Sequence, residues 1–458
     1  MIFSSLLFLF RFIPIFFIIY YLAPAKIKNL VLLIGSIIFY AWGEPKFLIL
    51  IVLSIVINYA AGLLIDYFNN KNKTLKKVSF ITAIIYNLSM LFVFKYIDFF
   101  ITNINKLTGL DLKLLELTLP LGISFYTFQI MSYVIDLYKG KITVERSFIT
   151  LGTYLTMFPQ LIAGPIVVYS DVSKKLHSRK ITLDEIEEGI ATFILGLGSK
   201  VLIANNVGML WDDIILIGYE NIKAGTAWLG VLAFSLQIFF DFNGYSLMAI
   251  GLGKMLGFDF PANFNFPYIS RSLTEFWRRW HITLSTWFRD YVYIPLGGNR
   301  KGQVRTYVNL FIVWFLTGFW HGAGWNFIIW GLFFFVMLAI EKTVLKKFLD
   351  EHVIFSHVYS TVLIGLSWMI FAITDINALS VYITKLVAIG TDLNALYFIR
   401  NYGVILLIGC ILSTPVLKGF YERNRKKPAG IIMLSVILIA SVAYLTDATY
   451  NPFLYFRF

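Results

Sequence analysis

Long apolar segments recur along the chain and are separated by short polar loops. An α-helix rises about 1.5 Å per residue, so about 20 apolar residues cross a hydrocarbon core about 30 Å thick. We predict crossings at residues 2–22, 30–43, 47–68, 78–101, 118–137, 188–210, 225–252, 306–319, 325–340, 356–374, 402–417 and 429–446. This pattern predicts an all-α polytopic membrane protein with about 11–12 transmembrane helices.

One further apolar stretch, residues 147–170, is long enough to cross but contains Pro159, Gly164 and Pro165 near its middle. Proline removes a helix hydrogen bond, and broken backbone at membrane depth persists only against protein or a water-filled cavity. A crossing here would also reverse the side of every later loop. We therefore expect a re-entrant segment; two short packed helices without a site are the alternative.

Basic residues gather in alternate loops of this arrangement. The loops at 23–29, 69–77, 138–187, 253–305, 341–355 and 418–428 contain 29 of the 39 Lys and Arg residues. Positively charged loops stay in the cytoplasm, so we predict that both termini are extracytoplasmic. The net charge of +13 follows from these loops and suits anionic lipid. It does not indicate a nucleic-acid partner.

Composition limits the remaining classes of protein. The 458 residues are 58% hydrophobic and 14% charged, which leaves no polar block long enough for a separate soluble domain, so we expect one domain, 1–458. The first apolar run ends in "APA" but is too long for a signal-peptide core, and we interpret it as a retained helix. Cys410 is the only cysteine, which excludes internal disulfides and cysteine-rich metal sites.

An ionisable side chain lies deep in the predicted membrane region, in the stretch "FLTGFWHGAGWNFIIWG" at 315–331. His321 follows Arg305, the last basic residue before its crossing, by about 24 Å of helix. Intramembrane ionisable groups are costly and are candidates for function. Nearby glycines would break the helix, and Trp320 and Trp325 would wall the imidazole. The alternative is a neutral histidine bonded to a carbonyl at a helix bend or at the outer interface.

A second histidine, His281, lies in the longest basic loop. Ser272 and Glu275 have capping-box spacing, and an aromatic face follows them, so we expect one interfacial helix on which Trp277, His281, Leu284 and Phe288 share a side. Guanidinium groups suit phosphate oxygens. We therefore expect donor phosphates to be bound by Arg278, Arg279, Arg300 and Lys301. Interfacial anchoring is the alternative role.

Three more polar residues are candidates for lining a site. Asp241 and Asn243 lie deep in the seventh predicted crossing, where structural pairing is the alternative to catalysis. Gln129 lies in the fifth crossing, and nothing local distinguishes a lining role from helix packing. The sequence offers no convincing cluster of metal ligands.

Several long motifs resemble one known family. "FWRRWHITLSTWFRDYVYIPLGGNR" (276–300) and "FLTGFWHGAGWNFIIWG" are similar to motifs of the membrane-bound O-acyltransferase family, in particular its bacterial alginate O-acetyltransferase branch. Further similar stretches are "LPLGISFYTFQIMSYVIDLY" (119–138), "FPQLIAGPI" (158–166), "FDFNGYSLMAIGLGKMLGF" (240–258) and the closing "YNPFLYFRF". The resemblance covers most of the chain.

This resemblance implies an activity. The histidine of the "WHG" motif, His321, is expected to be catalytic, and that of "RRWH", His281, is the second signature residue. Members of the family move an acyl group from a cytosolic thioester, through an intramembrane tunnel in the protein, to a hydroxyl. The expected donor is acetyl-coenzyme A or an acylated phosphopantetheine carrier protein, with no cofactor bound. A neutral histidine is able to remove the hydroxyl proton.

The family also implies surroundings and leaves alternatives. We expect a bacterial inner-membrane protein that O-acetylates an extracytoplasmic polysaccharide, commonly with an extracytoplasmic partner acetyltransferase. Transfer of D-alanyl or another acyl group to an envelope polymer is one alternative. A polysaccharide transporter or a scaffold for an export complex is another, because broken helices and intramembrane charges also occur in transporters.

Overall fold

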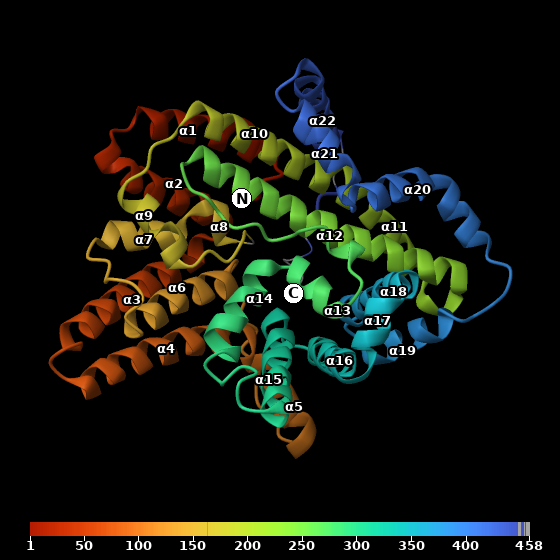
Figure 1. Ribbon diagram of the computed structural model, residues 1–458, viewed down its shortest axis with the longest axis horizontal. Helices are drawn as coiled ribbons and strands as arrows, with labels where there is room; N and C mark the ends of the chain where they lie inside the picture. The colour runs from red at the N-terminus through yellow and green to blue at the C-terminus, as the bar shows by residue number, and fades with distance from the viewer. Residues whose placement is uncertain (163, 448–449, 453, 455–458) are drawn as a thin grey trace. The chain divides into compact units, whose positions relative to one another are not determined.

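The computed structural model describes residues 1–162, 164–447, 450–452 and 454 (Figure 1). All regular elements in these residues are helical. Among the described residues, nine helical stretches are long and apolar enough to cross a membrane; they are Ala25–Gly43, Pro45–Phe68, Lys73–Lys95, Leu183–Ile217, Ala224–Met255, Trp325–Glu351, Val353–Ala372, Leu393–Leu412 and Pro428–Asp447. The chain is therefore an all-α polytopic membrane protein.

Contacts divide the chain into two compact units. Unit 1 comprises Met1–Phe193 and Ser246–Pro261, and unit 2 comprises Ile194–Tyr245 and Ala262–Phe458. Two long helices, α10 (Leu183–Gly198) and α12 (Ala224–Met255), contribute residues to both. The expectation of a single functional domain stays a prediction.

Unit 1 is built from apolar helices of different lengths. Its elements are η1 (Phe8–Phe12), α1 (Ile13–Leu22), α2 (Lys28–Gly43), α3 (Leu48–Phe68), α4 (Lys73–Lys95), α5 (Ile97–Thr108), α6 (Ile123–Tyr138), α7 (Phe148–Thr156), α8 (Phe158–Leu161) and α9 (Tyr169–His177). Asn58 on α3 and Asn87 on α4 exchange side-chain amide hydrogen bonds of 3.1 and 2.7 Å. Such polar pairs hold helices together where apolar surface alone gives little preference for contact.

The stretch 147–170 is broken as its prolines predict. Helix α7 ends at Thr156, α8 covers only Phe158–Leu161, and extended chain leads to α9. The Phe158 N–H, which has no partner within its own helix, donates to Ser36 Oγ at 3.1 Å. Residue 163 of this stretch lies outside the described residues. The interruption is confirmed, and entry and exit on one side of the membrane stay a prediction.

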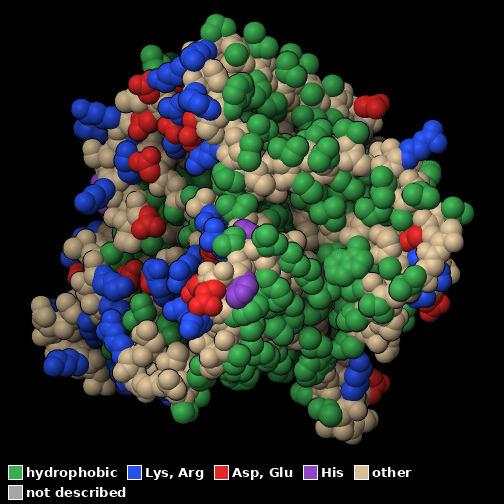
Figure 2. Space-filling view, turned by 45° about the vertical axis from the view of Figure 1, so that its right-hand side comes forward, with side chains coloured by type: hydrophobic (Ala, Val, Ile, Leu, Met, Phe, Trp, Pro, Cys, Tyr) green, Lys and Arg blue, Asp and Glu red, His purple; other side chains and the backbone are tan. Residues whose placement is uncertain are grey.

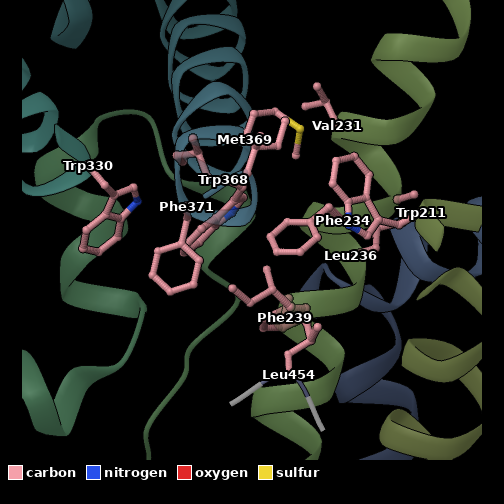
Figure 3. Packing of buried hydrophobic residues seen from close by; sticks show 14 of the residues in the cluster. Trp211, Val231, Phe234, Leu236, Phe239, Trp330, Trp368, Met369, Phe371 and Leu454 are labelled. Atoms are coloured by element: carbon pink, nitrogen blue, oxygen red, sulfur yellow. The ribbon is translucent and has the colours of Figure 1, made fainter. Parts of the chain in front are cut away.

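Unit 2 surrounds a core rich in tryptophan. Its remaining elements are η4 (Ser199–Ala204), α11 (Asn205–Ile217), η6 (Pro267–Ile269), α13 (Leu273–Arg279), α14 (Ile282–Phe288), η7 (Arg289–Tyr293), α15 (Gln303–His321), α16 (Trp325–Ile340), η8 (Glu341–Leu345), α17 (Lys346–Glu351), α18 (Val353–Ala372), α19 (Ile376–Lys385), α20 (Leu393–Leu412), α21 (Lys418–Asn424) and α22 (Pro428–Asp447). Figure 3 shows Trp330, Trp368 and Phe371 lying beside one another in this core.

Large apolar side chains remain exposed along several helices. On α20 and α22 these include Leu396, Val404, Leu407, Ile432 and Ile439, each more than half exposed. Hydrophobic side chains cover much of the surface in Figure 2. Apolar area of this extent on a helical bundle is typical of contact with lipid.

Two predicted helices differ from the observed ones. The crossing at 78–101 is divided at Tyr96 between α4 and α5. The Asp98 carboxylate at the start of α5 accepts hydrogen bonds from the N–H groups of Leu115 and Glu116, which tie α5 to the following loop. The single helix expected through His281 is also wrong. Helix α13 ends at Arg279 and α14 begins at Ile282, so the aromatic face expected there is divided between two helices.

Candidate active site

Helices α15 and α16 form a tight hairpin that presents His321 at its turn. A Cβ at Gly318 would collide with the Phe327 carbonyl oxygen, and one at Gly331 with the Trp314 carbonyl oxygen. Glycine at these two positions therefore lets the helix backbones touch. Because α15 ends at His321, the imidazole stands at a helix terminus that the neighbouring helix holds in place.

The His321 side chain is enclosed by aromatic rings. The imidazole centroid lies 5.0 Å from that of Trp320, 5.1 Å from Trp330 and 5.3 Å from Phe371, in edge-to-face arrangements. The residue is only 7% exposed. Trp325, the other expected wall, starts α16 with 52% of its surface exposed, and the structure supplies Trp330 and Phe371 instead.

His281 lies in the break between α13 and α14, in a left-handed backbone conformation with φ 43° and ψ 53°. This conformation is costly for a residue with a Cβ and persists only where the surroundings impose it, often at functional sites. The imidazole is fully buried and packs edge-to-face on Phe242 at 4.7 Å. Its centroid lies 6.1 Å from that of Trp320, which also contacts His321. One indole therefore contacts both signature histidines.

Asn263 is a site residue that sequence reasoning missed. Its main-chain oxygen accepts the Ile282 N–H at 2.9 Å, and its Oδ1 accepts the Thr283 N–H at 3.3 Å and hydroxyl at 2.9 Å. His281 Nδ1 lies 3.0 Å from the same Oδ1. Burial lowers the pKa of His281 to about 3, so the imidazole is neutral near pH 7. Asn263 precedes His281 by 18 residues, and no local pattern marks it.

Glu341 is a second residue near the site that the sequence did not predict. Its Oε1 accepts the Leu273 N–H at 2.6 Å, and its Oε2 accepts the Thr274 N–H and hydroxyl at 3.0 and 2.8 Å. This buried carboxylate thus satisfies the N-terminus of α13, where a negative charge is favourable. Within α13, Ser272 Oγ accepts the Glu275 N–H at 3.0 Å, which is half of the expected capping box.

The tryptophans of the "FWRRW" motif pack α13 against α15, α16 and α18. Trp277 packs on Trp314 of α15 at 4.7 Å and on Trp330 of α16 at 5.6 Å. Trp280 packs on Trp368 of α18 at 4.7 Å. Trp330 in turn contacts His321, so displacement of α13 would be transmitted to the imidazole.

Asp241 is engaged in structural pairing. Its Oδ1 lies 2.8 Å from Lys200 Nζ, both side chains are almost fully buried, and its Oδ2 accepts the Leu454 N–H at 2.8 Å. Lys200 also donates to Asn205 Oδ1 at 2.8 Å and to the Pro452 carbonyl oxygen. This buried ion pair holds the described part of the closing motif in unit 2. Residues 453 and 455–458 of that motif lie outside the described residues.

The remaining residues that the sequence predicts for the site do not gather around the two histidines. Arg279 pairs with Glu275 at 2.9 Å and donates to the Asn265 carbonyl oxygen at 3.1 Å, whereas Arg278 on α13 is exposed. Arg300 and Lys301 are exposed in the turn before α15. Asn243 is half-buried on α12. Gln129 is fully buried on α6 in unit 1, while the other expected site residues belong to unit 2.

Comparisons of the sequence with known proteins identify a family. The model of the membrane-bound O-acyltransferase family matches residues 144–384, which include both histidines, Asn263 and Glu341. The chain is 37% identical over 488 aligned positions to the probable alginate O-acetylase AlgI of Pseudomonas putida, covering all of both chains. It is 40% identical to the protein of the same name in Pseudomonas syringae, over 94% of this chain and 84% of the relative.

The chain is also similar to a relative that is named for a different polymer, peptidoglycan. The peptidoglycan O-acetyltransferase of Helicobacter pylori is 38% identical over 377 positions, which cover 75% of this chain and 70% of the relative. The chain belongs to the membrane-bound O-acyltransferase family and is a multi-pass membrane O-acyltransferase.

Proposed function

We propose that this protein transfers an acetyl group from a cytosolic thioester, acetyl-coenzyme A, to a hydroxyl outside the cytoplasm, for O-acetylation of an envelope or extracellular polysaccharide. The relatives named for alginate and peptidoglycan acetylation support the acyl group and the polymer class. The observation that carries the proposal is the placement of His281 and His321 against one buried indole, Trp320. The protein acts in a bacterial inner membrane with both termini outside the cytoplasm.

His321 is the general base of this reaction. Its imidazole takes the proton of the acceptor hydroxyl as the oxygen attacks the thioester carbonyl carbon. The C–S bond of the tetrahedral intermediate then breaks, and the leaving sulfur takes up the proton, so that an ester and a free thiol result. A thioester is already activated, so positioning and proton removal are the main tasks of the protein. The packed rings around His321 restrict its rotation and exclude bulk water.

Donor and acceptor reach the site from opposite sides of the membrane. Arg278, Arg300 and Lys301 are exposed in a segment whose basic residues predict a cytoplasmic position, and they bind the donor phosphates. The acceptor side is completed by an extracytoplasmic partner acetyltransferase that passes the acetyl group to the polysaccharide. His281 shapes the donor route at the cytoplasmic end.

Replacement of His321 by Ala tests the catalytic assignment. Loss of a general base typically lowers the rate by about 10²- to 10⁴-fold, so acetyl transfer from labelled acetyl-coenzyme A in membrane vesicles should fall by that factor. His352→Ala, a change at an exposed histidine of the same unit, is the matched control and should keep full activity. Near wild-type transfer by folded His321→Ala would contradict the proposal.

The same vesicles distinguish the alternative donors and functions. Labelled acetyl-coenzyme A and a D-alanylated carrier protein are supplied separately, and we expect only the first to label the acceptor fraction. Label from the D-alanyl donor would reassign the acyl group. A scaffold role would be indicated if His321→Ala retained polymer acetylation and loss of the whole protein abolished it.

A further inference from the structure

The orientation of the Asn263 amide follows from its partners. A main-chain N–H is able only to donate, and the Thr283 N–H points at Oδ1 of Asn263 at 3.3 Å. The amide oxygen therefore faces this cluster, since a flipped amide would place its NH₂ group against another donor. The Thr283 hydroxyl donates to the same oxygen at 2.9 Å.

This orientation determines where His281 carries its proton. Nδ1 lies 3.0 Å from an oxygen that is able only to accept, so Nδ1 must bear the hydrogen. A neutral imidazole has one N–H, and the other ring nitrogen, Nε2, then holds a lone pair. Burial favours the neutral form of His281, with a pKa of about 3.

Asn263 also holds the strained backbone of His281. Its main-chain oxygen binds the Ile282 N–H at 2.9 Å, directly after the left-handed residue, so one asparagine fixes both the main chain and the ring. The ring is flanked by Phe242 from α12 and Trp320 from α15. Phe242, Asn263 and Trp320, which contact the ring, are uncharged side chains.

We propose that Asn263 is a positioning residue for acyl transfer, which holds His281 in the Nδ1–H tautomer so that Nε2 accepts a hydrogen bond from an N–H or O–H of the substrate. His281 therefore acts as an acceptor and never as a cationic proton donor. The catalytic part of this inference rests on the proposed function, whereas the tautomer is a property of the resting protein.

The tautomer is measurable without catalysis. The full-length protein, labelled with ¹⁵N-histidine in lipid bilayers, contains five histidines, and the signals lost in His281→Gln belong to His281. We expect a protonated Nδ1 and an unprotonated Nε2 that do not titrate between pH 5 and about pH 8, because burial keeps the ring neutral. A proton on Nε2, or titration in this range, would overturn the inference.

Two variants of Asn263 test its role in the reaction. Asn263→Leu keeps the volume but removes the acceptor, so we expect mixed tautomers and a loss of kcat of at least about 10-fold. Asn263→Asp keeps an acceptor for Nδ1–H and Thr283, so the Nδ1–H tautomer should return. Its charge favours imidazolium, so activity should be lost at a higher pH on the acidic side than in the wild type.

Thr283→Val is the matched structural control, because it removes one hydrogen bond to Asn263 but leaves the bond to His281. It should keep the His281 tautomer. Folding of each variant is checked by thermal unfolding. Full activity of a folded Asn263→Leu with mixed tautomers would overturn the positioning role. That outcome differs from failure of the proposed function, which His321→Ala reports separately.

Discussion

At the scale of single residues, the binding partners of a buried polar group indicate whether its role is structural or catalytic. Asp241 and Lys200 satisfy each other and the chain end, which identifies a structural use for two charges deep in an apolar sequence. His281 is held by a neutral amide and aromatic rings, which is a poor environment for imidazolium. The buried ion pair therefore has a structural role, whereas the neutral buried histidine is a candidate for a role in the reaction.

The burial of His281 predicts a pH dependence of stability. Its folded pKa of about 3 lies below the unfolded value of about 6.5, so the unfolded state binds the proton first and stability falls as pH drops below about 6.5. At pH 5 the difference is about 2 kcal/mol at most. Thermal unfolding of the purified protein should therefore show a larger decrease from pH 7 to pH 5 for wild type than for His281→Gln. Equal decreases would argue against a neutral buried imidazole.

At the scale of elements, the short helix α13 links distant parts of unit 2. Glu341 caps it from η8, and its tryptophans pack on α15, α16 and α18. Seven residues would form little helix in isolation. The helix persists because four other elements bind its N–H groups and pack against its aromatic side chains, and this places the break at His281.

Removing the Glu341 carboxylate should loosen this helix. Glu341→Ala leaves the buried Leu273 N–H without its acceptor, which costs about 1–3 kcal/mol of unfolding free energy. Glu275→Ala on the same helix removes a partly exposed ion pair with Arg279 and should cost less than about 1 kcal/mol. Denaturant unfolding in detergent compares the two variants. A smaller effect at Glu341 than at Glu275 would contradict the capping role.

At the scale of the whole molecule, apolar helices and basic loops define how the chain enters a membrane. Single cysteines on a Cys410→Ala background test the predicted sides. A membrane-impermeant thiol reagent should label Lys301→Cys and Lys426→Cys only after permeabilisation, because both positions lie in basic loops predicted to be cytoplasmic. Leu107→Cys, an exposed position in a loop predicted to lie outside, should be labelled in intact cells. Labelling of residue 301 from outside would reverse the whole arrangement.

The sequence by itself determined most of the apolar helices, the broken stretch 147–170 and the two signature histidines. Each of these features depends only on residues that are close in the sequence, because a run of apolar residues, a proline or a motif affects the structure over about one helix length. Each of the twelve predicted crossings overlaps observed helical segments, but the crossing at 402–417 starts nine residues later than α20 (Leu393–Leu412), and the crossing at 78–101 is divided at Tyr96. The side of the membrane for each loop remains a prediction from charge.

Only the tertiary structure decided how the histidines are held. Asn263 is 18 residues from His281, and Glu341 is 68 residues from the Leu273 N–H that it accepts. Periodicity favoured a continuous helix through His281, but its left-handed backbone is stabilised by hydrogen bonds to Asn263 that no nearby pattern indicates. Long-range hydrogen bonds and aromatic packing outweigh local helix preference, since each buried polar group must find its partner wherever the fold places one.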